Sequence, residues 1–155
     1  MTTRKKETQT PDPVQVGLHC AAWHSRVFAR LVTRFYNSQM AGSGLRITQF
    51  SVLNAIKAQP PESIHQLAEL LGMERTSLQR TVDKLIEKGL VQSEPTGNRR
   101  ALGLSLTKEG EATYRQALSQ WQEAQAIFES LVGSQDWETT ARRLRTFSRQ
   151  VKQEL

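Results

Sequence analysis

Hydrogen-bond donors and positive charges gather on one side of the segment from Glu74 to Lys88. At about 100° per residue, a helix here would place four apolar side chains in one sector: Leu78, Val82, Leu85 and Ile86. The opposite sector would hold the polar ones: Thr76, Ser77, Arg80, Asp83 and Lys84. An arginine can donate two hydrogen bonds to O6 and N7 of guanine, so Arg80 is a candidate base reader in a DNA major groove. A charged face that is merely solvated is the alternative.

A second group of donors follows a Pro-Thr-Gly sequence, at Asn98, Arg99 and Arg100. Pro, Gly and Asn favour a hairpin turn between two short alternating segments, Leu90–Glu94 and Ala101–Leu106. An arginine on a projecting loop can enter a narrow minor groove, where the negative potential is enhanced. Both groups within one short stretch favour DNA binding over two unrelated solvated surfaces.

The neighbouring residues predict a scaffold that could aim both groups at DNA. Ser63 and Gln66 fit a capping box at the start of a short helix, Leu67–Leu71, which ends at Gly72. The donor-bearing segment would form a second helix that ends at Gly89. A helix–turn–helix of this kind places its second helix in the major groove.

Longer helices are predicted on both sides of this lobe. Apolar residues recur at helical spacing from Val14 until the glycines at 42 and 44 stop the pattern. Thr48 is expected to cap the next helix, which Pro60 ends.

Beyond the hairpin, Thr107 is expected to cap a helix that breaks at Gly133, and a last helix follows. That last helix has an apolar stripe: Trp137, Leu144, Phe147, Val151 and Leu155. A single helix cannot bury such a stripe by itself, so we favour packing against a second copy of the chain over packing within the monomer.

Three stretches resemble the MarR family of winged-helix transcriptional regulators. They are Ile47–Leu53, Leu67–Gly89 continuing to Val91, and Asn98–Ala101 running into Leu104–Gly110. The resemblance extends over nearly the whole chain after the polar N-terminal residues. In the family the wing tip normally reads Asp-x-Arg; here Asn98 stands at the Asp position and Arg100 matches the Arg. Loss of that carboxylate removes an ion-pair partner for nearby arginines.

The resemblance implies a mainly α fold: a winged helix–turn–helix with a two-stranded β-wing, plus N- and C-terminal helices that form a dimerisation bundle. We expect a disordered tail at 1–13, an N-terminal dimerisation helix at 14–46, the DNA-binding lobe at 47–107 and C-terminal dimerisation helices at 108–155, all in one integrated domain. The implied DNA-facing residues are Arg75, Thr76, Ser77, Gln79, Arg80, Lys84, Asn98, Arg99 and Arg100. A two-fold dimer would bind a pseudo-palindrome with half-sites about 10 bp apart.

Cys20 and His24 lie four residues apart on the first predicted helix, where an adjacent imidazole could make the thiol easier to oxidise. Some family members sense organic peroxides through a cysteine about two residues from this place, and an inert buried thiol is the alternative. Family members also bind small aromatic or amphipathic effectors between the dimer helices and the DNA-binding lobe. The residues that could line such a cleft are Trp23, His24, Phe28 and Phe50, which ordinary core packing would explain as well.

Composition narrows the classes of function. The 155 residues carry 21 Lys+Arg and 15 Asp+Glu, a net charge of +6 with a sequence pI of about 9.9, which suits a polyanionic partner. We find no apolar run that predicts a membrane span, no secretory signal and no pair of cysteines for a disulfide, so we expect a cytoplasmic protein. His19, Cys20 and His24 would not share one helix face, so no metal site is expected. No nucleophile motif, P-loop or dinucleotide fingerprint predicts an enzyme or a cofactor.

The sequence therefore predicts a homodimeric repressor that binds double-stranded DNA at a pseudo-palindromic operator and is released by a small-molecule effector. Two other functions stay open. One is a regulator that senses oxidants through Cys20. The other is a helical dimeric protein-interaction module whose wing no longer reads DNA because Asn98 replaces Asp.

Overall fold

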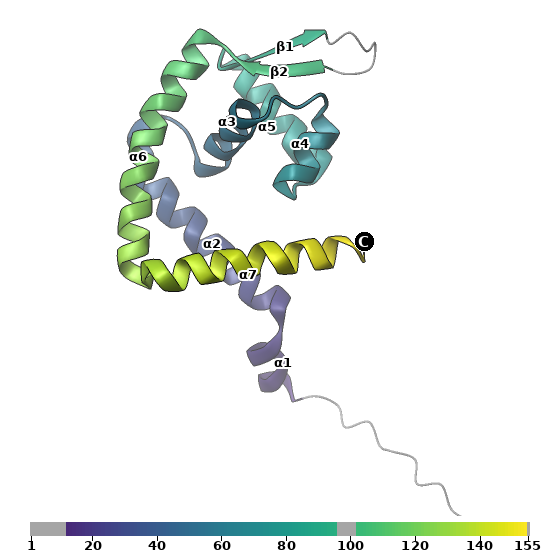
Figure 1. Ribbon diagram of the computed structural model, residues 1–155, viewed down its shortest axis with the longest axis vertical. Coiled ribbons are helices and arrows are strands. Elements are labelled where there is room, and N and C mark those ends of the chain that lie inside the picture. Colours follow the sequence, from purple (N-terminus) through teal and green to yellow (C-terminus); the bar gives the residue numbers. More distant parts are fainter. Residues whose placement is uncertain (1–11, 96–101, 155) are drawn as a thin grey trace, which may run out of the picture. The chain divides into compact units, whose positions relative to one another are not determined.

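The computed structural model describes residues 12–95 and 102–154, and the chain divides between Phe35 and Tyr36 into two compact units. Within the described ranges there are seven α-helices, one short 3-10 helix and one two-stranded antiparallel sheet (Figure 1). The expected fold class, mainly helical with a helix–turn–helix followed by a two-stranded ribbon, is confirmed.

The first unit holds α1 (Pro13–His19) and most of α2 (Ala21–Gln39). Asp12 caps α1, because its carboxylate accepts a hydrogen bond from the Val14 amide at 3.2 Å. The predicted continuous helix from Val14 is wrong. Cys20 has an extended backbone, with φ −71° and ψ 108°, and this residue separates α1 from α2.

Local hydrogen bonds explain this break. In a continuous helix the Leu18 carbonyl would accept from the amide four residues on; here it accepts from Nε2–H of His24 at 3.0 Å. His19 similarly donates from Nδ1–H to the Gln15 carbonyl at 2.9 Å. Gly17 adds low helix propensity to the preceding turn. The His24 imidazole thus satisfies a carbonyl at the C-terminal end of α1.

The second unit begins within α2 and continues through a 3-10 turn (Ala41–Ser43) to α3 (Ile47–Ala58). The expected cap at Thr48 is wrong, because the helix begins one residue earlier and Thr48 lies in its first turn. The first amides are satisfied from elsewhere: Asn37 Oδ1 accepts from the Ile47 amide at 2.8 Å, and Gln49 Oε1 accepts from the Arg46 amide at 3.0 Å. The prolines after Ala58 end the helix as predicted.

The helix–turn–helix consists of α4 (Ile64–Leu71) and α5 (Arg75–Glu87). Ser63 caps α4 by accepting from the Gln66 amide at 3.2 Å, as the capping box predicted. The Gln66 side chain reaches back to the Glu62 amide, at 2.9 Å, rather than to that of Ser63. Gly72 ends α4 with a φ of 61°, a left-handed conformation that favours glycine.

Two strands, β1 (Val91–Pro95) and β2 (Leu102–Leu106), pair antiparallel with Val91 opposite Leu106. Val91 and Leu104 are buried, so one face of the ribbon packs against the lobe. The predicted turn between the strands falls at residues 96–101, outside the described part of the chain.

Two long helices complete the second unit: α6 (Lys108–Val132) and α7 (Ser134–Lys152). The Thr107 side chain caps α6 as predicted, accepting from the Gly110 amide at 2.9 Å. The predicted break at Gly133 is also confirmed, with a φ of 85°.

The core of this unit lies where α3 contacts α4, α5, α6 and β2. Its largest fully buried side chains are Met40, Val52, Leu53, Ile56, Leu67, Leu78, Val82, Leu85 and Val91. The Phe50 ring stacks on Tyr114 at 5.5 Å and on Trp121 at 6.2 Å between ring centroids. This packing fixes α5 within the lobe, so its outer face is presented by a rigid support.

Candidate nucleic-acid interface

The α5 helix buries one face and exposes the other, as its sequence predicted. Leu78, Val82 and Leu85 are fully buried, whereas Ile86, expected in the same stripe, is 39% exposed. Ile86 lies at the edge of the stripe, beyond the reach of the core. The side chains on the outer face are exposed at every predicted DNA-facing position of the helix: Arg75, Thr76, Ser77, Gln79, Arg80 and Lys84.

The cations on the outer face of α5 have no carboxylate partner among the described residues, because the nearby carboxylate of Asp83 accepts a hydrogen bond from an amide instead. Gln79 Nε2 donates to Asp83 Oδ1 at 2.8 Å, so the one carboxylate in the middle of the helix is held by an amide. Arg75, Arg80 and Lys84 form no ion pair with any described residue. Three cations without an intramolecular counter-charge can pair with phosphates or base acceptors at no cost of breaking an existing bridge.

The predicted wing tip is not part of the described structure. Asn98, Arg99 and Arg100 lie within residues 96–101, and their role stays a prediction. The two strands that lead to the tip are in place and follow directly after α5.

Cys20 and His24 do not form the predicted pair on one helix face. Cys20 is the residue with an extended backbone between α1 and α2, and the His24 ring donates a hydrogen bond to the Leu18 carbonyl. A shared face requires both residues in one helix, so that premise is wrong, and a redox role for Cys20 stays an untested prediction.

The four predicted effector residues fall into two groups. Trp23, His24 and Phe28 are exposed side chains of α2, and Trp23 is 62% exposed. Phe50 is buried in the aromatic stack of the second unit. The proposed cleft that would contain all four stays a prediction.

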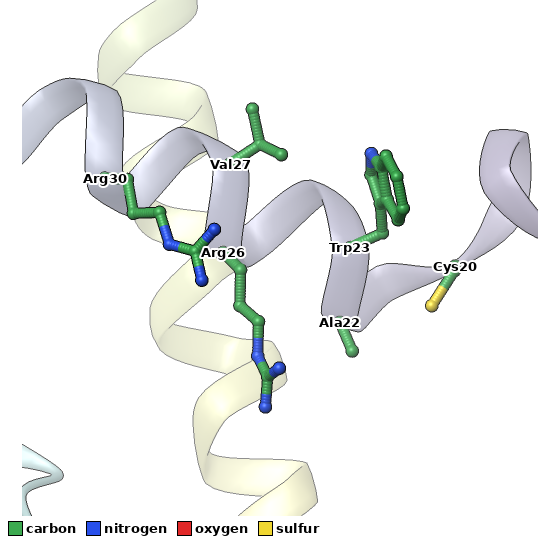
Figure 2. Close-up of a pocket in the computed structure, with 6 residues that line it drawn as sticks. All are labelled: Cys20, Ala22, Trp23, Arg26, Val27 and Arg30. Atoms are coloured by element: carbon green, nitrogen blue, oxygen red, sulfur yellow. The ribbon is translucent and has the colours of Figure 1, made fainter.

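The first unit contains a cavity of about 370 Å³ on α2. It is lined by Cys20, Ala22, Trp23, Arg26, Val27 and Arg30 (Figure 2). Of these, only Trp23 was predicted as an effector residue and only Cys20 as a redox one. Arg26 and Arg30 extend from the same side of the helix in Figure 2, as their spacing of four residues requires, so the sequence carried a signal for this pair.

A second cavity, of about 510 Å³, lies between α3, α4 and α6 in the second unit. Its lining residues are Phe50, Ser51, Asn54, Ala55, Ala58, Gln59, Leu70, Leu71, Leu118 and Trp121. The aromatic rings of Phe50 and Trp121 form part of one wall, and the Asn54 Oδ1 accepts from the Tyr114 hydroxyl at 2.7 Å. The sequence identified only Phe50 here, because the other lining residues meet through tertiary packing.

Among the described residues, no group of three His, Cys, Asp or Glu side chains is placed to hold a metal ion. No helix in the described ranges has the length and apolar character needed to cross a membrane.

Comparisons with known proteins agree with this geometry. A family model described as "MarR family" matches residues 43–101, a range that contains α3, α4, α5 and β1. The DNA-bound transcriptional regulator MosR from M. tuberculosis is similar in structure, with a TM-score of 0.77 and 30% sequence identity, over 86% of this chain and 96% of that one.

Two further relatives extend the comparison. The PcaV transcriptional regulator from Streptomyces coelicolor, solved with its natural ligand, shares the fold at a TM-score of 0.75 and 18% identity, over 90% of this chain and 96% of that one. The uncharacterized HTH-type transcriptional regulator YwoH from Bacillus subtilis is 32% identical over 88 residues. That match covers 57% of this chain and 64% of YwoH, so the chain spans less than two thirds of this relative's length.

Proposed function

Because this chain belongs to the MarR family of transcriptional regulators, we propose that it binds duplex DNA sequence-specifically as a homodimer and represses transcription in the cytoplasm. The observation that carries the proposal is the outer face of α5. Its exposed donors and unpaired cations stand on a helix whose inner face is locked into the core by Leu78, Val82 and Leu85. DNA reading needs a rigid support of this kind, because base contacts depend on placement within a fraction of an ångström.

Arg80 is our candidate base reader, and Thr76 and Ser77 would contact neighbouring base edges or phosphates. All three lie in the N-terminal half of α5, which suits a recognition helix that enters the groove with that half. Arg75 and Lys84 would contact phosphates, which orients the helix without reading sequence. The wing residues Arg99 and Arg100 would add a minor-groove contact, and Asn98 would take the place of the usual acidic residue of the wing tip.

A homodimer is supported by uncovered apolar side chains. In α7, Leu144, Phe147 and Val151 are 42%, 56% and 61% exposed, at spacings of three and four residues. Trp23, Val27 and Leu31 form a similar exposed stripe on α2. Apolar stripes of this length on helices favour burial against a partner helix.

A small aromatic or amphipathic effector is the third element of the proposal. The cavity between α3, α4 and α6 has aromatic and aliphatic walls, and polar groups from Ser51, Asn54 and Gln59. It adjoins Leu70 and Leu71, the last turn of α4, so a ligand there would press on the helix–turn–helix directly. PcaV, which has the same fold, was solved with its natural ligand, and this supports a ligand-responsive regulator.

The proposal is tested by selecting bound sequences from a random duplex library with the full-length protein. We expect an enriched pseudo-palindrome with half-sites about 10 bp apart. Binding to all duplexes alike would contradict sequence-specific regulation and favour the protein-interaction module. Sedimentation of the free protein and of the complex then gives the number of chains per operator.

A further inference from the structure

The Thr107–Gly110 segment lies away from the exposed face of α5, yet it contacts the end of that helix. The α5 helix ends in a Schellman motif, in which the Leu90 amide donates to Leu85 O at 2.9 Å and the Gly89 amide to Ile86 O at 2.8 Å. Gly89 has a φ of 69°, which turns the chain away from the helix axis. The carbonyls of Gly89 and Leu90 therefore lie in the connection between the end of α5 and the start of β1.

Thr107 binds both of those carbonyls. Its hydroxyl donates to Gly89 O at 2.6 Å, and its amide donates to Leu90 O at 3.1 Å. The same hydroxyl accepts from the Gly110 amide at 2.9 Å, which caps α6. A hydroxyl has one hydrogen and two lone pairs, so it can cap α6 and hold the end of α5 at the same time.

Gly110 makes this close approach sterically feasible. It is buried in the first turn of α6, and a Cβ atom there would lie 1.9 Å from the Leu90 carbonyl oxygen. That distance is far inside van der Waals contact, and the obstacle is backbone rather than a movable side chain. Any larger residue would push the start of α6 away from the end of α5.

We propose that Thr107 and Gly110 form a joint that sets the direction of α5 relative to α6. This inference rests on the proposed function, because it makes both residues positioning residues for DNA reading that do not themselves contact DNA. The α6 helix is 25 residues long, and at its far end Phe128 packs edge-on against Trp137 of α7 at 5.0 Å. A change of angle at the joint would therefore move α5 relative to the helices that we propose to dimerise.

A change in the angle between α5 and α6 is expected to reduce the sequence specificity of DNA binding more than its general affinity. Two recognition helices must meet successive major grooves in register to read bases, whereas attraction of cations to phosphates tolerates misplacement. Loosening the joint should lower operator binding and leave binding to unrelated duplex DNA nearly unchanged. A residue that only stabilised the fold would not change the ratio of the two affinities.

The first test measures that ratio for full-length variants, with a selected operator and a scrambled duplex. Thr107→Val keeps the shape of the side chain but removes both hydroxyl bonds, and we expect the ratio to fall about tenfold or more. Thr107→Ser keeps the hydroxyl and should retain the ratio. Ser63→Ala is the matched control, because it removes a cap of the same geometry from α4, where Ser63 accepts from the Gln66 amide at 3.2 Å.

The second test needs neither DNA nor a dimer. Spin labels at Lys84→Cys on α5 and Ser119→Cys on α6, in a Cys20→Ser background, report the distance between the two helices; both positions are exposed. Labelled chains are diluted into unlabelled protein so that only distances within one chain are measured. Thr107→Val and Gly110→Ala should shift or broaden this distance distribution, and Ser63→Ala should not.

A Thr107→Val variant that keeps the wild-type distance distribution and the wild-type affinity ratio would overturn the joint. If the wild-type protein shows no preference among duplexes, the proposed function fails, and the distance measurement alone decides on the joint. If Gly110→Ala does not fold, Thr107→Val still gives the answer, because it introduces no clash.

Discussion

The α5 and α7 helices are both amphipathic, yet they expose opposite faces. In α5 the apolar stripe is buried by its own lobe, and the polar face is left outside. In α7, all of which the structure describes, no residue is fully buried: Trp137 packs on Phe128 of α6, whereas Leu144, Phe147 and Val151 are exposed. The same sequence pattern therefore leads to two kinds of surface, depending on whether another element of the same chain covers the stripe.

Charge does not distinguish the two helices. The α7 helix carries more basic residues than α5: Arg142, Arg143, Arg145, Arg149 and Lys152. One of them, Lys152, lies 3.4 Å from Glu69 in an exposed ion pair, which contributes little to stability. The helices differ in whether their apolar residues are buried within the chain. For this reason we assign α5 to DNA binding and α7 to contact with a second copy of the chain.

The largest effect is expected from placing a charge in the apolar stripe of α7. Phe147→Asp would bury an unpaired carboxylate in the proposed dimer contact, and we expect dissociation into monomers with at least about a hundredfold loss of operator affinity. The control is Thr146→Asp, which adds the same charge outside the apolar stripe, at a half-buried position about 100° around the helix from Phe147. Sedimentation and a binding titration measure both; a dimeric Phe147→Asp protein with intact affinity would contradict the assignment of α7.

A smaller effect is expected from Arg80, on the outer face of α5. Arg80→Ala should cost about 1–3 kcal/mol of binding and relax the base preference at one position in each half-site. Arg115→Ala removes an exposed arginine from α6 and should change neither property. Repeating the library selection with each variant distinguishes the cases: unchanged preference in Arg80→Ala would mean that this arginine does not read bases.

The wing prediction has a different signature. Arg100→Ala should cost about 1 kcal/mol, mainly on operators with A·T-rich flanks, because a narrow minor groove concentrates negative potential. Titrations with A·T-rich and G·C-rich flanks around the same half-sites measure this dependence. An equal loss on both would indicate an ordinary phosphate contact.

The features that the sequence predicted correctly depend on residues close together in the chain. Ser63, Gly72 and Thr107 were identified as helix ends because a cap involves only residues within one turn. The two faces of α5 followed from periodicity alone, apart from Ile86 at the edge of its stripe.

The predicted helix ends were wrong where a side chain, rather than the regular backbone pattern, satisfies the open groups of a helix. The break at Cys20 depends on the His24 ring reaching the Leu18 carbonyl, and the start of α3 depends on Asn37, ten residues earlier in the chain. The cavity between α3, α4 and α6 was represented only by Phe50, because three helices must be packed before its walls exist. Hydrophobic periodicity contains no information about which helices will be neighbours.

The smallest effect concerns the packing that supports α7. Tyr36 donates a hydrogen bond to Gln125 Oε1, and its ring packs on Phe128, which in turn contacts Trp137 at the start of α7. Burial, with the nearby charge of Glu129, raises the pKa of Tyr36 above its ordinary value of 10.0. The folded state therefore holds the Tyr36 proton more tightly than the unfolded state does. The contribution of this protonation to the free energy of unfolding is complete below about pH 10 and is lost as the pH rises through the folded pKa.

Tyr36→Phe should lower the free energy of unfolding by about 1 kcal/mol near neutral pH, because Gln125 Oε1 loses its donor. It should also remove part of the loss of stability at alkaline pH, so that the two proteins converge above about pH 10. Urea unfolding across this range measures both effects. If the free energies of unfolding of the two proteins differ by the same amount at every pH, Tyr36 titrates alike in the folded and unfolded chains. The packing at the start of α7 would then not depend on the Tyr36 hydroxyl.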